Sequence, residues 1–148
     1  MADSTQSSIE IAASPGEVLD VVADFEQYPT WAKQVTSCTV VSEDGDGWAD
    51  RVRFVLDAGA IKDRYVLEYD WDIDEDGVGS VSWSLVESDV LKAMNGTYTL
   101  APSATGTLVT YDLAVDVKIP MIGMLKRKAE KMIVDTALKE LKKRVESF

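Results

Sequence analysis

Hydrophobic positions recur at helical spacing over one long stretch at the C-terminal end, from Pro120 to Phe148. Proline suits the first turn of a helix, because the N–H that it lacks would have no intrahelical partner there. The three- and four-residue spacings that follow trace one broad face, which predicts an amphipathic helix about 40 Å long at 1.5 Å per residue. The run is too charged to span a membrane, so we expect its apolar face to be buried against the chain or a partner. The positions on this face are Met121, Ile122, Met124, Leu125, Ala129, Met132, Ile133, Thr136, Ala137, Leu138, Leu141 and Val145.

The N-terminal part of the chain predicts a short strand and two short helices. Ser7–Ala12 alternates between polar and apolar residues, which is typical of a strand. Ser14-Pro15-Gly16-Glu17 has the spacing of a capping box with proline at the first helical position, so a helix begins there. We expect this helix to break at Pro29, because the residue before a proline avoids the helical conformation. Thr30 is then expected to cap one further turn, which holds Trp31, Ala32 and Val35.

Between these segments the pattern alternates strand, turn and strand. The turns are short, and connections of this length join antiparallel neighbours. We therefore predict an α+β fold in which a curved, seven-stranded antiparallel sheet wraps around the long C-terminal helix, with two short helices after the first strand. No linker or repeat divides the chain, so we expect one domain over residues 1–148. The six remaining strands are predicted at Thr36–Glu43, Trp48–Asp57, Ile61–Ile73, Val78–Val86, Leu91–Leu100 and Thr107–Lys118.

Alternation within the strands also predicts which side chains face the helix, except in Thr36–Glu43, where the phase is undetermined. The inward set is rich in large aromatic residues and methionines. Ligand cavities are mostly apolar with a few placed polar groups, so this set is typical of a pocket for a planar or polyprenyl-like molecule. The same residues would equally fill a solid core, and the pattern alone does not choose between the two. The candidate ligand-binding residues are Trp31, Phe54, Tyr65, Tyr69, Trp83, Met94, Tyr98, Tyr111, Met121, Met124, Leu125 and Met132.

Composition limits the chemistry that these residues can carry. The chain has no histidine, which removes the commonest general base near neutral pH and every Ser-His or Cys-His pair. A single cysteine, Cys38, excludes an intrachain disulfide and a cysteine-rich metal site. We therefore expect neither a metal nor a tightly held cofactor. The first residues lack the basic and apolar regions of a secretory signal, so we expect a cytoplasmic protein.

The net charge of −11 disfavours nucleic acid and anionic membrane surfaces as partners. The charge is uneven, because residues 120–148 hold eight Lys and Arg against four Asp and Glu, whereas the rest holds seven against twenty-two. One interpretation is that the basic side chains form a solvated face of this helix, with the last cations stabilising its C-terminus. The other is that Lys139, Lys142 and Lys143 form a docking surface for a partner protein. We expect a monomer or a weak homodimer without stable membrane insertion.

Asp63 is the one carboxylate that the alternation of its strand places on the same, inward face as Tyr65 and Tyr69. If buried, it would have a raised pKa and could act as a general acid or base beside a tyrosine, so Asp63 and Tyr65 are the candidate catalytic residues. Because Asp63 lies near the start of its strand, we expect it instead to be solvated or salt-bridged.

Other charged residues in the strands predict structure rather than chemistry. Arg51, Arg53 and Arg64 fall in the outward phase and are expected on the exterior of the sheet. Asp72–Gly77 matches the first half of a calcium loop, but Trp83 stands where the loop requires glutamate. We interpret this segment as an acidic hairpin.

Motifs spread over the whole chain resemble those of one known family. The residues are Ser8-x-x-x-x-Ala13-x-Pro15-x-x-Val18-x-x-Val21, Tyr28-Pro29-x-Trp31, Gly96-Thr97-Tyr98-x-Leu100, Gly106-Thr107-x-Val109-x-Tyr111 and Ile119-Pro120. In this order they resemble the polyketide cyclase/dehydrase and lipid-transport superfamily, whose START-like, Bet v 1-like members have the helix-grip fold. The resemblance implies an apolar ligand cavity between the sheet and the C-terminal helix. Members include lipid and quinone carriers, hormone receptors and aromatase/cyclases, and the fold does not choose among these activities.

The resemblance favours the pocket over the filled core. The leading hypothesis is that the protein binds or carries a small hydrophobic molecule, such as a lipid, a quinone or a polyketide-like compound. An entrance is expected between Ala58–Ala60, Tyr28–Trp31 and Pro120–Leu125. The alternative is a polyketide aromatase/cyclase or dehydratase that uses the same cavity, and a third hypothesis is the docking surface on the basic helix.

Overall fold

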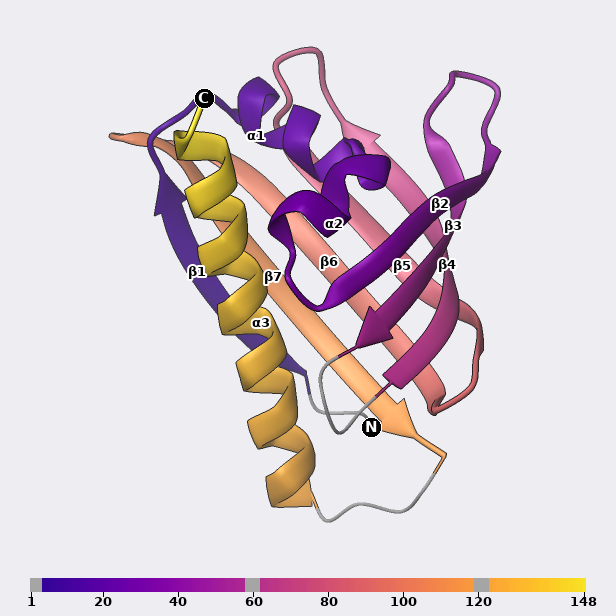
Figure 1. Cartoon of the computed structure of the whole chain (residues 1–148). Coiled ribbons are helices and arrows are strands. Elements are labelled where there is room, and N and C mark those ends of the chain that lie inside the picture. The colour runs from indigo at the N-terminus through magenta and orange to yellow at the C-terminus, as the bar shows by residue number, and fades with distance from the viewer. Residues whose placement is uncertain (1–3, 58–61, 119–122) are drawn as a thin grey trace.

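One antiparallel sheet curves around a long helix in the computed structural model, which describes residues 4–57, 62–118 and 123–148, with the side chains of 123–126 left out (Figure 1). The helix α3 lies across β1 and β7, while α1 and α2 close the upper end of the sheet in Figure 1. The elements are β1 (Thr5–Ile11), α1 (Pro15–Ala23), the 3-10 turn η1 (Phe25–Gln27), α2 (Tyr28–Trp31), β2 (Val35–Glu43), β3 (Ala49–Asp57), β4 (Lys62–Ile73), β5 (Gly79–Ser88), β6 (Leu91–Ser103), β7 (Gly106–Val117) and α3 (Gly123–Glu146).

The sheet has seven strands in the order β1-β7-β6-β5-β4-β3-β2, and every neighbouring pair is antiparallel. Strands β2 to β7 follow one another as hairpins, because their connections are too short for crossovers. The first strand instead pairs with the last, Thr5 opposite Leu113. The predicted α+β helix-grip architecture is confirmed.

The turns between the strands show why the hairpins form where the sequence predicts them. In the β4–β5 turn the Asp74 carboxylate accepts hydrogen bonds from the backbone N–H groups of Asp76 and Val78, at 2.8 and 3.0 Å. Asp44 repeats this arrangement in the β2–β3 turn. Aspartate is common in turns because its side chain can bond to the backbone two residues on. Asp72–Gly77 is therefore the acidic hairpin that we expected.

The two short helices confirm one expectation and correct another. Ser14 is the N-cap of α1, and its hydroxyl accepts a hydrogen bond from the N–H of Glu17 at 3.3 Å, as a capping box requires. Pro29 does not interrupt helical structure as expected. It lies in the first turn of α2, where a proline is tolerated. Thr30 is not an N-cap but donates its hydroxyl to the carbonyl of Gln27, and Val35 already belongs to β2.

The predicted inward phase of the strands is confirmed by burial. The aromatic and methionine candidates on β3 to β7 are all buried or half-buried, namely Phe54, Tyr65, Tyr69, Trp83, Met94, Tyr98 and Tyr111. In β2, where the pattern was undetermined, Cys38 lies opposite Phe54 and Val40 opposite Val52, so both face inward. Register shifts occur in the β2–β3 hairpin, between Val66 and Leu67 in β4–β5, and between Leu91 and Ala93 in β6–β7. Arg51, Arg53 and Arg64 are exposed on the outer face, as expected.

Helix α3 is joined to the edge strand β1 by polar groups as well as by its apolar face. The buried Glu130, 1% exposed, accepts a hydrogen bond from the Thr5 hydroxyl at 3.1 Å and one from the backbone N–H of Val115 at 2.7 Å. Asp135 accepts from Ser7, and Glu146 accepts from the N–H of Ala12. Two of these bonds satisfy backbone N–H groups, of Val115 and Ala12, that lie beyond the ends of the β1–β7 pairing. Among the described residues, no helix is long and apolar enough to cross a membrane.

Candidate functional site

An internal cavity of about 140 Å³ lies between the inner face of β3–β7, the α2 segment and α3. Most of its wall is apolar or aromatic. It opens between the segment after α2 and the middle of α3, where Ile133 is 40% exposed. The lining residues are Val22, Tyr28, Trp31, Ala32, Gln34, Val35, Phe54, Leu56, Tyr65, Leu67, Tyr69, Trp83, Met94, Tyr98, Tyr111, Ile133, Thr136, Ala137 and Glu140.

The sheet side of the cavity is a continuous layer of aromatic rings. Phe54 stacks on Tyr65 with centroids 5.2 Å apart, and Trp83 contacts Tyr98 and Tyr111 at 5.2 and 5.6 Å. Gly96 lies opposite Trp83, and a Cβ on it would be 2.3 Å from two carbons of the indole ring. Glycine in the Gly96-Thr97-Tyr98 motif therefore allows the Trp83 ring to lie flat on β6.

Four tyrosine hydroxyls in this layer make no hydrogen bond with another described residue, and their oxygens border free space instead of being fully enclosed. They belong to Tyr65, Tyr69, Tyr98 and Tyr111, which all line the cavity. Burial raises the pKa of each phenol above its ordinary value of 10.0, and neighbouring acidic groups add to the effect at all but Tyr98. These hydroxyls are therefore neutral at physiological pH and can both donate and accept hydrogen bonds.

The helical side of the cavity differs from the sheet side. The Tyr28 hydroxyl donates a hydrogen bond to the carbonyl of Val22. This bond joins the start of α2 to α1. Trp31 packs on Tyr28 with centroids 4.9 Å apart, and its indole N–H is buried without a partner among the described residues. Glu140 lies at the opening, where one carboxylate oxygen accepts the backbone N–H of Lys33 at 3.2 Å.

Most of the candidate ligand-binding residues line this cavity, but their role in binding stays a prediction. Met132 does not line it: its side chain is 62% exposed, because the α3 face toward the cavity runs through Ile133, Thr136, Ala137 and Glu140. Met121 and the side chains of Met124 and Leu125 lie outside the described residues. The candidates that line the cavity are Trp31, Phe54, Tyr65, Tyr69, Trp83, Met94, Tyr98 and Tyr111.

The candidate binding residues did not include Gln34, Thr136 and Glu140, which give the opening its polar groups, although Thr136 was expected on the apolar face of the helix. Thr136 and Glu140 follow Ile133 and Ala137 at helical spacing, so the pattern contained this signal. Nothing in the pattern predicts Gln34, which lies between α2 and β2. Of the expected entrance, Tyr28–Trp31 is α2 and borders the cavity, whereas Ala58–Ala60 and Pro120–Ile122 lie outside the described residues.

Asp63 is buried rather than solvated, and it forms no ion pair with the residues that the structure describes, contrary to expectation. It is 5% exposed and accepts hydrogen bonds from the Ser88 hydroxyl at 2.7 Å and from the N–H groups of Asp89 and Val90 at 3.1 and 3.3 Å. The carboxylate thus closes the turn between β5 and β6. Asp63 does not line the cavity, so the suggested pairing with Tyr65 as catalytic residues finds no support in this geometry.

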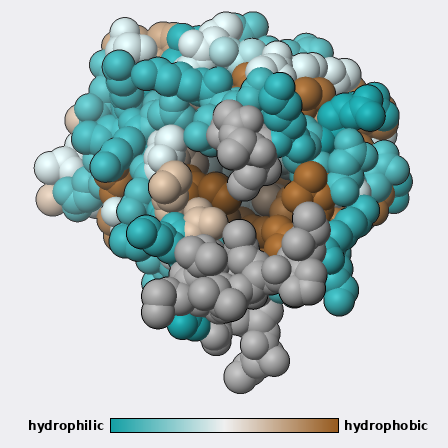
Figure 2. Space-filling view, turned by 60° about the horizontal axis from the view of Figure 1, so that its bottom comes forward, coloured by the Kyte–Doolittle hydropathy of each residue, from teal (hydrophilic) through white to brown (hydrophobic). Residues whose placement is uncertain are grey.

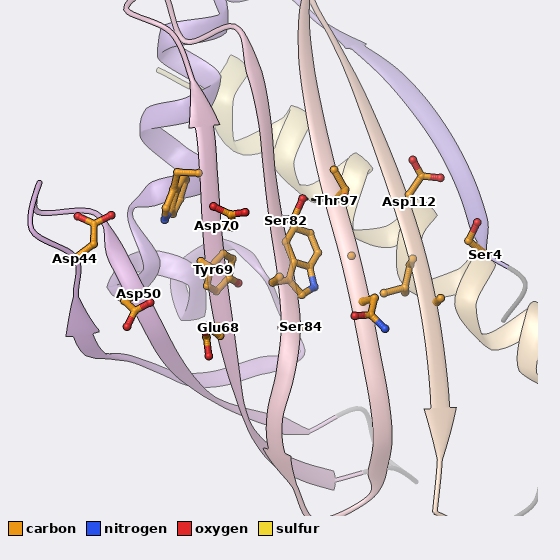
Figure 3. A pocket seen from close by; sticks show the side chains of 16 residues that line it. Ser4, Asp44, Asp50, Glu68, Tyr69, Asp70, Ser82, Ser84, Thr97 and Asp112 are labelled. Carbon is orange, nitrogen blue, oxygen red and sulfur yellow. Dashed lines mark hydrogen bonds between the residues drawn. The ribbon is translucent and has the colours of Figure 1, made fainter. Parts of the chain in front are cut away.

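A second, wider depression of about 900 Å³ lies on the outer face of the sheet (Figure 3). Its side chains are mainly carboxylates and hydroxyls, including Glu68, Asp70 and Asp112, and it is open to solvent. Some of these groups already have partners, since Gln6 donates to Asp112 and Arg51 pairs with Glu68. In the described ranges, no cluster of acidic residues has the geometry of a metal site. The internal cavity is therefore the better candidate for an apolar ligand.

Hydrophobic surface is also visible at the end of the molecule where β3 ends and α3 begins (Figure 2). It lies among the strand ends, beside the residues drawn in grey. The half-buried apolar residues at these strand ends are Leu56, Leu85, Leu91, Met94 and Val117. Two of them, Leu56 and Met94, also line the internal cavity, so apolar lining continues from the cavity toward this end of the sheet.

Comparisons with known proteins agree with this architecture. Residues 2–146 match the family described as polyketide cyclase / dehydrase and lipid transport. A START superfamily protein from Mycobacterium smegmatis is 23% identical, with a TM-score of 0.89 and 97% of each chain covered. The protein TTHA0849 from Thermus thermophilus is 28% identical, with a TM-score of 0.79 and 98% of each chain covered.

A more distant likeness is to an aromatase/cyclase, Zhui from Streptomyces sp. R1128. It is 13% identical, with a TM-score of 0.80, and the alignment covers 99% of this chain and 94% of that one. At this identity the likeness shows the fold alone. No curated protein matches the chain.

Proposed function

The chain belongs to the polyketide cyclase/dehydrase and lipid transport family, and from this premise we propose that it binds a small hydrophobic molecule in the cavity between the sheet and α3. The family description names lipid transport beside polyketide cyclases and dehydrases, and one protein of similar structure is an aromatase/cyclase. A cytoplasmic location and a monomeric or weakly dimeric state stay predictions.

The observation that carries this proposal is an apolar cavity bordered by four phenol hydroxyls and by the buried, unpartnered indole N–H of Trp31. Buried polar groups in a filled core are normally hydrogen-bonded, and leaving one unpaired costs about 1–3 kcal/mol. Tyr28 follows this rule, whereas the indole N–H of Trp31 is fully buried without a partner among the described residues. The tyrosine hydroxyls of the aromatic layer border the free space and make no hydrogen bond with described residues. A bound molecule with oxygen atoms would supply the missing hydrogen bonds while its apolar body fills the space.

The size of the cavity limits what it can hold. Pockets for drug-sized ligands have volumes of about 300–1,000 Å³, whereas a cavity of about 150 Å³ can bind benzene. At about 140 Å³ the cavity therefore fits one ring-sized group. A larger ligand would require α3 or the aromatic layer to move.

Catalysis in the same cavity is less well supported. General acid–base catalysis needs a group that titrates near the working pH and reaches the substrate. Among the described lining residues the tyrosines have pKa values raised by burial, and Glu140 at the opening is the one charged side chain. The aromatase/cyclase alternative thus has the fold but no evident proton-transfer group in this part of the chain.

The proposal is tested by NMR titration of the isotope-labelled protein with toluene and with benzylacetone, a neutral ketone with one phenyl ring. We expect saturable shifts at Tyr98, Tyr111 and Ala137. Ala137→Phe should abolish them because the new ring fills the cavity, whereas Ala104→Phe, in the exposed β6–β7 turn, should leave them unchanged. No saturable shift in the wild-type protein, or equal binding by Ala137→Phe, would refute the proposal.

A further inference from the structure

A basic depression of about 340 Å³ lies on the surface beside the opening of the cavity. Four cationic side chains line it against one carboxylate, on a chain whose net charge is −11. They come from two places in the fold, since Lys33 follows α2 and the other three lie on α3. The lining residues are Thr30, Trp31, Lys33, Lys139, Glu140, Lys143, Arg144 and Ser147.

None of these cations forms an ion pair with a described residue, although Lys139 helps to lower the pKa of Asp135 and the Arg144 guanidinium lies 4.8 Å from the centre of the Phe148 ring. The ion pairs along α3 join Lys131 to Asp135 and Lys142 to Glu146, which lie outside the depression. The Glu140 carboxylate accepts a hydrogen bond from the backbone N–H of Lys33, and it forms no ion pair with a described ammonium group. Stabilisation of the helix C-terminus explains cations in the last turn of α3, but neither Lys33 nor Lys139 lies in that turn.

The depression and the cavity share two residues, Trp31 and Glu140, so they adjoin at the opening. The cavity itself has no cationic side chain among its described lining residues, and its tyrosines are neutral. Moving a charge into such surroundings without a partner is strongly unfavourable. A ligand that carries a negative charge would therefore keep it outside, next to the lysines.

We propose that the ligand is an amphipathic anion, whose ring-sized apolar body occupies the cavity while its carboxylate lies in the basic depression lined by Lys33, Lys139, Lys143 and Arg144. This inference rests on the proposed function and adds the chemical class of the ligand to it. It also gives the cations around Lys139 a role in small-molecule binding, in place of the partner-protein surface considered from the sequence.

The test compares three probes that share a phenyl ring and a short chain: hydrocinnamate, which is anionic, benzylacetone, which is neutral, and phenylpropylammonium, which is cationic. We expect hydrocinnamate to bind about three- to tenfold more tightly than benzylacetone at low salt, because two or more exposed charges each add a modest attraction. The advantage should shrink as salt is added, since exposed charges are screened. Phenylpropylammonium should bind most weakly.

The double variant Lys139→Gln/Lys143→Gln should remove the advantage of hydrocinnamate and leave the affinity for benzylacetone unchanged. A matched control, Lys92→Gln/Lys128→Gln, changes the net charge equally at exposed positions away from the depression and should preserve the preference. Equal binding of hydrocinnamate and benzylacetone to the wild type, or the same loss in both double variants, would overturn this inference while the proposed function stands. Failure of all three probes to bind would overturn both.

Discussion

Gly96 determines where the Trp83 ring lies in the cavity wall, so Gly96→Ala should disturb both stability and binding. The added Cβ would be 2.3 Å from the indole carbons, and the ring must therefore move. Overpacking of this kind costs about 1–3 kcal/mol in unfolding free energy, and we expect weaker binding of benzylacetone as well. Urea denaturation and NMR titration measure the two effects. Gly45→Ala is the control, because nothing lies within 4 Å of its added Cβ, and it should change neither quantity.

Asp63 stabilises a turn, and its replacement by asparagine should lower stability without affecting ligand binding. The carboxylate accepts three hydrogen bonds from Ser88, Asp89 and Val90, and an amide would turn an N–H₂ donor toward some of these donors. Because hydrogen bonds to a buried charged group contribute about 1.5–3 kcal/mol, we expect a loss in that range in urea denaturation. Asp70→Asn, on the outer face of the same strand, should stay within about 0.5 kcal/mol. A normal stability for Asp63→Asn would contradict this role.

Helix α3 and the edge of the sheet depend on each other through Glu130. In the described residues the pairing of β1 with β7 begins at Thr5 opposite Leu113, so the N–H of Val115 lies beyond it and is bonded by the Glu130 carboxylate instead. Glu130→Ala leaves this buried N–H without its acceptor, and we expect a loss of about 2–3 kcal/mol in unfolding free energy. Glu130→Gln should lose less, because its amide oxygen can still accept. Hydrogen exchange should quicken at Val115 in Glu130→Ala and stay slow in β4, and unchanged exchange at Val115 would count against this bond.

The elements themselves were largely predictable from local patterns. Alternation in β3 to β7 identified the inward side chains, and the Ser14–Glu17 capping box identified the start of α1, because both signals are local. The role of Glu130 could not be predicted, since a glutamate in a helix is ordinarily exposed and its partners are distant in sequence. The same holds for Asp63, whose hydrogen-bond donors come near it only when β4 and the β5–β6 turn are brought together.

For the molecule as a whole, the sequence predicted which rings surround the cavity but not how much space remains between them. Cavity volume depends on the packing of many side chains at once, and the pattern of Phe54, Tyr65 and Trp83 fits a pocket and a filled core equally well. Met132 shows a related limit, because a broad apolar helix face does not determine which residues at its margin stay exposed. The basic depression likewise combines Lys33 with residues over a hundred positions away in the chain.

All five tyrosines of the chain have a pKa raised by burial, so the protein should resist alkali and then unfold cooperatively. Burial also raises the pKa of Cys38 from 9.0 to about 12. In the unfolded chain these groups lose their protons near their ordinary values, 9.0 for the thiol and 10.0 for the phenols, while the folded state keeps them. Stability from the neutral forms is therefore complete below about pH 9 and is lost as the pH rises toward the folded-state values.

Spectrophotometric titration of tyrosinate, followed together with far-UV circular dichroism, measures this behaviour. We expect little tyrosinate at about pH 10, where free tyrosine is half ionised, and then one step in which ionisation and loss of secondary structure coincide. Tyr98→Phe and Tyr111→Phe should each reduce the amplitude of that step without creating an earlier one. A tyrosine that ionises near its ordinary pKa in the folded protein would mean that water reaches its hydroxyl freely. The cavity would then be too wet for the neutral phenols to select an apolar ligand.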